Sequence, residues 1–394
     1  MRSYDYLIVG GGMTADAAAK GIREVDAQGT IGLLSAEPHA PYDRPPLTKS
    51  LWKDKPLEAI WRHTTKASVD LLLGRTVTAL DVQHKTVGDD RGETYSFRKL
   101  LLATGGSPRR LPFGGDDVIY YRTLADYNRL RELTANGQRF VVIGGGFIGS
   151  ELAAALTMNH KEVVMIFPGS GICDRLFTKD LSQFLNGFYR QKGVELWIGE
   201  SVTALERKGG QCVVTTRSGK QTAADGVIAG LGIEPNIHLA KLAGLDTADG
   251  IVVDERLRTS QPDIYAAGDV AFFHSPALDR RLRVEHEDNA NTMGRQAGRN
   301  MAGAAEPYHH LPFFYSDMFE LGYEAVGEVD SRLSAMADWK EPYREGVIYY
   351  QKGGQVRGVL LWNVWGQVDA ARELIAARQP FIAQDLKQRL PKAA

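Results

Sequence analysis

The sequence predicts an α/β protein with two doubly wound parallel sheets and a C-terminal α+β domain that carries an antiparallel sheet. Two similar segments predict the parallel sheets, residues 6–21 (YLIVGGGMTADAAAKG) and residues 141–156 (VVIGGGFIGSELAAAL). Each consists of an apolar strand, a glycine turn and the start of an alanine-rich helix. The antiparallel sheet is predicted by EGVIYYQKGGQVRGVLLWN, which has the pattern of a hairpin around Gly353 and Gly354.

Both glycine turns have the spacing G-x-G-x-x-G/A. The first glycine makes a tight turn, the second lets the backbone approach a pyrophosphate, and the third position must be small so that helix and strand can pack. The matching residues are Gly10, Gly12 and Ala15 in the first turn, and Gly144, Gly146 and Gly149 in the second. A single turn of this kind is often only structural. Two in one chain favour two Rossmann-like dinucleotide-binding domains.

Composition agrees with a soluble enzyme. The 394 residues carry a net charge of −1, so charge does not indicate nucleic acid or an anionic membrane as a partner. The first strand begins by about Tyr4, so we expect no signal or transit peptide. Cys173 and Cys212 lie far apart, so we expect a cytoplasmic protein with no disulfide and no metal site.

Charged residues follow the first repeat. Glu37 stands 22 residues after Ala15, where such a site places an acid on a ribose hydroxyl. The alternative is an exposed acid at a strand end. The next segment, PYDRPPLTKSLW, is a proline-stiffened loop whose Arg44 and Lys49 could hold charges against a fixed ligand.

Three more strands end in glycine turns. LLLATGGSPRRL (residues 101–112) and DGVIAGLGIEPN (residues 225–236) share one design. The third strand, DIYAAGDVA, ends at Gly268 and Asp269. The carboxylate of Asp269 could accept hydrogen bonds from ribityl or ribose hydroxyls.

The order of these motifs resembles that of the FAD- and NAD(P)-dependent two-dinucleotide-binding flavoprotein reductases. PYDRPPLTK, RVEHEDNA and GVLLWNVW resemble the branch that contains apoptosis-inducing factor and the ferredoxin and rubredoxin reductases. The C-terminal PFFYSDMFELGYEAVGEVD and LLWNVW are most similar to a bacterial-type apoptosis-inducing-factor homologue. We expect no N-terminal mitochondrial segment, and the link between VDSRL and GVIYY is short where apoptosis-inducing factor carries a long insertion. The cell-death role is therefore not carried over.

The resemblance implies three domains. A discontinuous FAD-binding domain would comprise residues 1–115 and 240–305. An NAD(P)H-binding domain would comprise residues 116–239, and a C-terminal interface domain residues 306–394. FAD would be held tightly and non-covalently at the first glycine turn, and NADH or NADPH would exchange at the second.

The resemblance also implies three catalytic residues, Lys49, Glu151 and His286. Lys49 would lie near flavin N5 and pair with Glu151, and its fixed ammonium would stabilise the anionic reduced flavin and raise its potential. The residues alone allow other readings. Lys49 could be a solvated loop lysine, Glu151 a first-turn helix acid favoured by the helix dipole, and His286 a satisfied buried imidazole.

The remaining site residues follow from the motifs or the resemblance. Those expected at FAD, besides Lys49 and His286, are Gly10, Gly12, Met13, Thr14, Ala15, Ala36, Glu37, Arg44, Val77, Ala103, Thr104, Gly105, Arg122, Gly268, Asp269, Glu285 and Tyr315. Those expected at NAD(P)H are Gly144, Gly146, Phe147, Ile148, Gly149, Glu151, Gly169, Ser170, Arg175, Gly232 and Glu285. Tyr315 stands where the relatives have a tryptophan, which keeps an aromatic wall and loses the indole N–H.

The second site lacks its usual acid. About 20 residues past the glycines, such an acid holds the ribose hydroxyls and repels a 2′-phosphate. Gly169 stands there, in MIFPGSG, and Ser170 and Arg175 follow. We therefore expect the chain to accept both NADH and NADPH, or to prefer NADH only weakly.

The chain has no cysteine pair of the kind that flavin–disulfide chemistry needs. The expected function is that of an NAD(P)H oxidoreductase, with hydride passing from NAD(P)H to FAD N5. Electrons would then pass to a ferredoxin- or rubredoxin-type carrier, a quinone or oxygen. The alternative is a redox-responsive, apoptosis-inducing-factor-like flavoprotein with slow turnover and a stable charge-transfer complex with NADH. We expect no nucleic-acid partner and no membrane span, and a homodimer is compatible with the resemblance.

Overall fold

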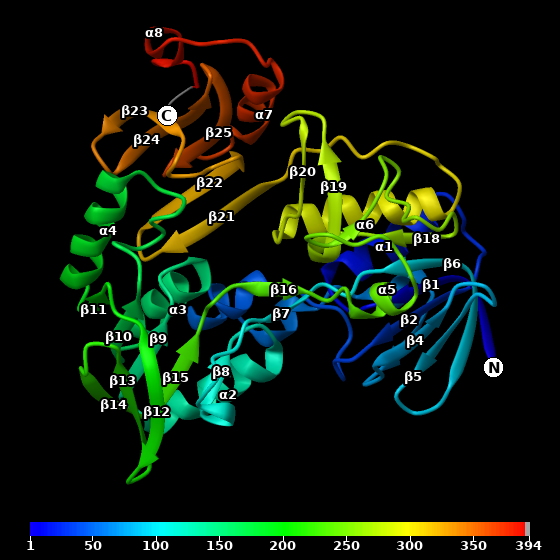
Figure 1. Ribbon diagram of the computed structural model, residues 1–394, viewed down its shortest axis with the longest axis horizontal. Coiled ribbons are helices and arrows are strands. Elements are labelled where there is room, and N and C mark those ends of the chain that lie inside the picture. The colour runs from blue at the N-terminus through cyan, green and yellow to red at the C-terminus, as the bar shows by residue number, and fades with distance from the viewer. Residues whose placement is uncertain (391–394) are drawn as a thin grey trace. The chain divides into compact units, whose positions relative to one another are not determined.

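The computed structural model describes residues 1–390, which form two compact units (Figure 1). Unit 1 comprises three stretches of chain: Met1–Arg44, Leu57–Ser107 and Glu234–Phe313. Unit 2 comprises Pro45–Pro56, Pro108–Ile233 and the chain from Phe314 onward. None of the described helices is both long enough and apolar enough to cross a membrane.

Unit 1 is built on a sheet in the order β3-β2-β1-β6-β5-β4, with β18 paired to β6. Its strands are β1 (Arg2–Val9), β2 (Ile31–Ser35), β3 (Val69–Leu73), β4 (Val77–Asp81), β5 (Thr86–Asp89), β6 (Thr94–Leu102) and β18 (Ile264–Ala266). β1 runs parallel to β2 and to β6, and β18 runs parallel to β6, whereas β5 pairs antiparallel with both of its neighbours. The parallel part is the doubly wound sheet that the first glycine turn predicted.

The helices of unit 1 are α1 (Met13–Arg23), α5 (His238–Leu242) and α6 (Glu287–Met301). α1 and α6 touch backbone to backbone. A Cβ on Gly298 would lie 2.0 Å from the carbonyl oxygen of Ala18, and one on Gly21 would lie 2.1 Å from that of Arg295. Only glycine permits this approach. A second, smaller sheet contains β17 (Ile251–Val252), β19 (Ala271–Ser275) and β20 (Arg280–Leu282).

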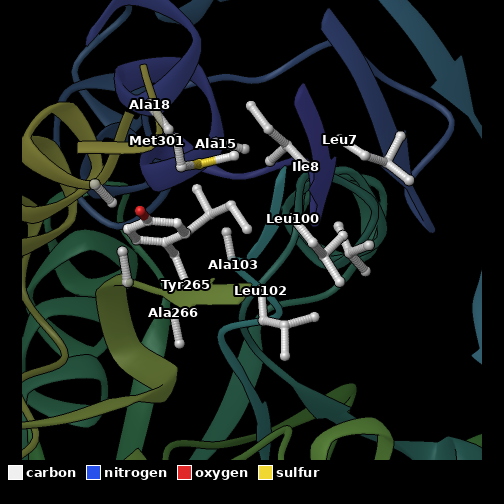
Figure 2. Close-up of a cluster of buried hydrophobic side chains, with 14 of the residues drawn as sticks. Leu7, Ile8, Ala15, Ala18, Leu100, Leu102, Ala103, Tyr265, Ala266 and Met301 are labelled. Carbon is white, nitrogen blue, oxygen red and sulfur yellow. The ribbon is translucent and has the colours of Figure 1, made fainter. Parts of the chain in front are cut away.

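The core of unit 1 forms where α1 covers the central strands (Figure 2). Leu7 and Ile8 are adjacent on β1 and both are fully buried. Burial of both faces of this strand is typical of parallel sheets covered by helices. Ala15 and Ala18 of α1 and Tyr265 of β18 belong to the same buried cluster. The small alanines let the helix lie close to the strands beside the glycine turn.

Unit 2 repeats the design with a parallel sheet in the order β11-β10-β9-β15-β8. Its strands are β8 (Val118–Tyr120), β9 (Arg139–Ile143), β10 (Glu162–Phe167), β11 (Glu195–Ile198) and β15 (Gly226–Ala229). The helices between them are α2 (Leu124–Asn136), α3 (Phe147–Met158) and α4 (Lys179–Gln191). An antiparallel group contains β12 (Val202–Lys208), β13 (Gln211–Thr216) and β14 (Gln221–Ala224). The short strands β7 (Gly106–Pro108) and β16 (Ile233–Pro235) lie where the chain passes between the units.

The C-terminal part has an antiparallel sheet in the order β21-β22-β25-β24-β23. Its elements are β21 (Phe313–Met318), β22 (Leu321–Gly327), β23 (Ser334–Glu341), β24 (Glu345–Lys352), β25 (Gln355–Trp362), α7 (Val368–Ala376) and α8 (Ala383–Leu386). The predicted hairpin is confirmed: Lys352 pairs with Gln355, and Gly353 and Gly354 have φ of +58° and +80°. The predicted fold class is therefore confirmed in all three of its parts.

Candidate functional site

The first glycine turn lies between β1 and α1, and its two leading glycines have different roles. A Cβ on Gly10, at φ +123°, would lie 2.1 Å from the carbonyl oxygen of Ala103. Gly10 is therefore required by the fold. A Cβ on Gly12 would meet nothing within 4 Å, and its φ of −92° suits any residue. The open space beside Gly12, at the start of α1, fits a pyrophosphate bound by the helix N-terminus.

Glu37, just past the end of β2, is held by two neighbours. Arg44 Nη2 lies 2.6 Å from Glu37 Oε1, and the Tyr42 hydroxyl donates to Glu37 Oε2 at 2.6 Å. All three come from the chain that follows β2, so the carboxylate and guanidinium stand together at the end of this strand. The chain before β4 also contacts the end of β2, because the backbone N–H of Arg75 donates to the carbonyl of Ser35.

The turn after β6 is hydrogen-bonded to Asn236, which follows β16. Asn236 Nδ2 donates to the carbonyl of Thr104 at 2.8 Å, and the Asn236 N–H donates to that of Gly105 at 2.9 Å. In return, Thr104 Oγ1 donates to the carbonyl of Asn236 at 2.9 Å. Asn236, the last residue of the predicted segment DGVIAGLGIEPN, thus fixes the turn at Thr104 and Gly105.

Gly268 packs against α1. At φ +76°, its Cβ would lie 2.3 Å from Oγ1 of Thr14. This approach brings the neighbouring Asp269 to the N-terminal end of α1. That Asp269 accepts hydroxyl hydrogens of a bound cofactor stays a prediction.

His286 is the N-cap residue of α6 and is only partly exposed. Desolvation by the surrounding protein lowers its pKa to about 4, although Asp269 and Asp288 both act to raise it. The imidazole is therefore neutral between pH 5 and 8. The unfolded chain, with a histidine pKa of about 6.5, binds this proton more tightly, so protonation opposes folding as the pH falls below about 6.5. The adjacent Glu285 is exposed and accepts from Arg283 Nη1 at 2.5 Å.

The second glycine turn lies between β9 and α3 and repeats the first in detail. A Cβ on Gly144, at φ +116°, would lie 2.3 Å from the carbonyl oxygen of Gly230. A Cβ on Gly149 would lie 2.0 Å from the carbonyl oxygen of Gly144. At Gly146 it would meet nothing within 4 Å. The open position is again the second glycine, beside a helix N-terminus.

A buried acid on α3 gathers three side chains. Lys49 Nζ lies 2.7 Å from Glu151 Oε1, so the predicted pairing of these residues is confirmed. Ser316 Oγ donates to the same oxygen at 2.6 Å, and Thr48 Oγ1 donates to Oε2 at 2.5 Å. The lysine side chain is 13% exposed and the glutamate 4%. The ammonium lies over the ring of Tyr315, 5.3 Å from its centroid.

The segment Pro45–Pro56 that carries Lys49 is anchored in unit 2. The carbonyl of Leu47 accepts from Trp52 Nε1 at 2.8 Å and from the Tyr121 hydroxyl at 2.5 Å. Asn159 Nδ2 donates to the carbonyl of Trp52 at 3.1 Å. These bonds fix the backbone on either side of Lys49, so its ammonium is a positioned charge and not a mobile surface group.

The turn after β10 contains an acid that the sequence did not single out. Gly169 and Ser170 follow this strand, and Arg175 is exposed. Asp174 Oδ2 accepts from the backbone N–H of Ser170 at 2.7 Å and from Ser170 Oγ at 3.2 Å.

The other predicted residues lie on these same elements. In unit 1, Met13, Thr14 and Ala15 begin α1, Ala36 follows β2, and Val77 begins β4. In unit 2, Phe147 and Ile148 begin α3, Gly232 follows β15, and Arg122 precedes α2. Of the residues expected at FAD, Lys49, Arg122 and Tyr315 belong to unit 2 and the others to unit 1. Of those expected at NAD(P)H, Glu285 belongs to unit 1 and the others to unit 2.

Both cysteines are free and buried. Burial raises the pKa of Cys173 to about 12 and also raises that of Cys212. Both remain protonated thiols at neutral pH, and a thiol is a poor nucleophile and a poor metal ligand. Within residues 1–390 no group of histidine, cysteine, aspartate and glutamate side chains is arranged to hold a metal ion.

Sequence reasoning missed several of these side chains. Thr48 and Ser316 each stand next to a residue that was named, and short hydroxyl side chains carry no periodic signal. Tyr42 lies within the proline-rich segment PYDRPPLTKSLW, and its place beside Arg44 could have marked it as part of the site. Asp174 and Asn236 act through turns whose geometry cannot be read from spacing.

Each glycine turn follows a strand of a parallel sheet and precedes a helix, and a buried lysine–glutamate pair lies in unit 2. These features are those of an FAD-dependent NAD(P)H oxidoreductase. The chain belongs to the pyridine nucleotide-disulphide oxidoreductase family, whose model matches residues 4–294. A second model, for the C-terminal domain of mitochondrion-associated apoptosis-inducing factor, matches residues 297–342 and 337–377.

Relatives match over nearly the whole chain. Apoptosis-inducing factor 1, mitochondrial, of Dictyostelium discoideum is 34% identical and covers 98% of this chain and 81% of its own length. Putidaredoxin reductase CamA of Pseudomonas putida is 32% identical, and the match covers 95% of this chain and 92% of that protein. The solved structure of a covalent putidaredoxin reductase–putidaredoxin complex matches with a TM-score of 0.91 at 31% identity, over 98% of this chain and 96% of that one.

Proposed function

We propose that this oxidoreductase delivers electrons from NAD(P)H to a small iron–sulfur carrier protein. The observation that carries the proposal is the likeness, over 98% of the chain, to a reductase whose solved partner is putidaredoxin. The two buried thiols support it, because neither can serve as a disulfide relay. Bound FAD would supply the chemistry of accepting two electrons as a hydride and releasing them singly.

In this proposal different residues of the chain bind different parts of the two cofactors. Gly12 and Asp269 hold the pyrophosphate and hydroxyls of FAD, and Glu37 holds a ribose. Gly146 admits the pyrophosphate of NAD(P)H at the start of α3. The predicted domain ranges, residues 1–115 with 240–305, 116–239 and 306–394, describe these binding roles and remain part of the proposal.

The function is tested by anaerobic mixing of the purified protein with NADH, followed by reoxidation with ferredoxin, rubredoxin or a quinone in separate experiments. We expect rapid bleaching of the flavin absorbance and faster reoxidation by an iron–sulfur carrier than by oxygen. The match to the C-terminal model of apoptosis-inducing factor favours a second candidate, a slowly turning-over NADH-responsive binding protein. A long-wavelength absorbance that persists for minutes, with no acceleration by any carrier, would support the second and reject the first.

Lys49 is proposed to contact the flavin and set its potential. Support comes from its fixed position, its burial and its ion pair with Glu151. Lys49→Met should lower the flavin midpoint potential by about 30–60 mV, because loss of a charge-assisted contact worth about 1.5–3 kcal/mol destabilises the reduced anion. Glu151→Gln should raise it, because the ammonium then lacks its counter-charge.

Spectroelectrochemical titration of each purified variant measures both shifts, with Lys49→Arg as the charge-conserving control. If both substitutions moved the potential in the same direction, or by less than about 10 mV, the pair would be structural only.

We also propose that the protein is cytoplasmic and forms a homodimer. Its two free cysteines are compatible with the reducing cytoplasm. Light scattering of the holoprotein would test the homodimer.

A further inference from the structure

The side chain of Asp174 fills the space that Gly169 leaves empty. A Cβ on Gly169 would lie 2.4 Å from Oδ2, 2.9 Å from Cγ and 3.0 Å from Oδ1 of Asp174. Gly169 stands just past β10, where a nucleotide site of this kind normally places the acid that reads the adenosine ribose. A carboxylate is therefore present at this position, although it comes from a residue five places further along the chain.

The turn that carries Asp174 is held rigidly. Its carboxylate accepts two hydrogen bonds from Ser170, and Asn186 Nδ2 donates to the carbonyl of Ser170 at 3.2 Å. The N–H of Cys173 donates to the carbonyl of Gly145 at 2.8 Å. This last bond ties the turn to the second glycine loop itself. The acid and the open cradle at the start of α3 thus belong to one fixed assembly.

One oxygen of Asp174 is left for a ligand. The hydrogen bonds found for this side chain among residues 1–390 both end on Oδ2. We infer that Asp174 is the residue that selects NADH over NADPH, a role that rests on the proposed binding of NAD(P)H at the second glycine loop. Its Oδ1 accepts hydroxyl hydrogens of the adenosine ribose.

The charge of Asp174 explains the direction of selection. A ribose 2′-hydroxyl can donate to the carboxylate, whereas a 2′-phosphate brings like charge to hydrogen-bonding distance. At this range the repulsion acts well inside the Debye length of about 8 Å, so salt screens it only partly. Arg175, the next residue in the sequence, is a cation that could favour a phosphate. Its side chain is exposed, so its attraction is weakened by water and by the freedom of a long side chain.

The test uses holoenzyme and steady-state reduction of an artificial dye with NADH and with NADPH. Asp174→Asn keeps an oxygen for Ser170 and removes the charge. We expect its NADH/NADPH ratio of kcat/KM to fall at least about tenfold below wild type, mainly through KM for NADPH. Asp180→Asn is the matched control, because it removes an exposed acid six residues away on α4 and should leave the ratio within about twofold.

A second substitution separates this inference from the permissive pocket expected from the sequence. If the pocket lacked an acid, Gly169→Glu would raise the NADH/NADPH ratio about tenfold. If Asp174 fills it, the new side chain displaces an existing carboxylate, and the ratio stays level or falls. The double variant Gly169→Glu/Asp174→Asn should then have a higher ratio than Asp174→Asn alone.

A wild type that uses both nucleotides equally, or an Asp174→Asn ratio within about threefold of wild type, would overturn the inference. Isothermal titration calorimetry of NAD⁺ and NADP⁺ binding to the same proteins tests the role of Asp174 without turnover. Selective binding of NAD⁺ that is lost in Asp174→Asn would support Asp174 even if no carrier were ever reduced.

Discussion

Replacing Gly12 by valine should give a folded protein that does not retain FAD. The φ of −92° suits valine, and no atom of the described protein beyond Gly12 and its two chain neighbours lies within 4 Å of the new Cβ. The isopropyl group would instead occupy the space in which the pyrophosphate approaches the backbone. We expect FAD affinity to fall at least about 100-fold, or ~2.7 kcal/mol, because the clash removes both the close contact and the helix N–H groups from reach.

The measurement is the ratio of flavin to protein absorbance after purification, with circular dichroism as the check on folding. Gly10→Val is the contrasting variant. Its Cβ would meet the carbonyl oxygen of Ala103 at 2.1 Å in a left-handed backbone conformation, so it should destabilise the fold itself. A Gly12→Val protein that is yellow with one FAD per chain would contradict the assignment of this cradle.

Replacing Gly146 by valine should leave the protein yellow and nearly unreactive toward NADH. The geometry is that of Gly12, with φ −87° and open space at the Cβ, but the helix is α3. We expect kcat/KM for flavin reduction to fall at least about 100-fold, which corresponds to ~2.7 kcal/mol in the barrier. The flavin content should stay at one per chain.

Stopped-flow absorbance at the flavin band measures this loss. Gly187→Val on α4 is the control, because it also points into open space and should leave the rate within about twofold. The two cradle variants also test each other. If Gly146→Val released FAD and Gly12→Val kept it, the proposed roles of the two glycine loops would be reversed.

The elements that the sequence predicted best are those encoded locally. β1 with α1 and β9 with α3 were predicted because an apolar strand, a glycine turn and an alanine-rich helix follow one another without interruption. The hairpin at Gly353 was equally local, since two adjacent glycines with positive φ suffice to turn the chain. The glycine turns of the candidate site, with the open positions at Gly12 and Gly146, could therefore be predicted from the local sequence without knowledge of tertiary contacts.

Other parts of the site depend on contacts that spacing does not encode. Lys49 and Glu151 are 102 residues apart in the sequence, and their pairing was predicted only through the resemblance. Thr48, next to Lys49, and the distant Ser316 complete that cluster. The acid at Asp174 was missed because the prediction looked along the strand, whereas the turn folds back over Gly169. A glycine can therefore mark a place reserved for another residue's side chain.

Unit 2 is assembled from three separate stretches of chain, and this bears on how the protein is synthesised. The segment Pro45–Pro56 emerges from the ribosome early, but the helix that carries Glu151 and the strand that carries Ser316 come about 100 and 270 residues later. Domains generally fold as units in the order of synthesis. Here unit 2 cannot be completed until nearly the whole chain is made, because Ser316 and the C-terminal antiparallel sheet are synthesised last. The same connectivity means that an excised fragment beginning at Pro108 would lack the segment that neutralises its buried glutamate. Nascent chains stalled between residues 233 and 313 should therefore be strong clients of chaperones that shield unpaired apolar surface.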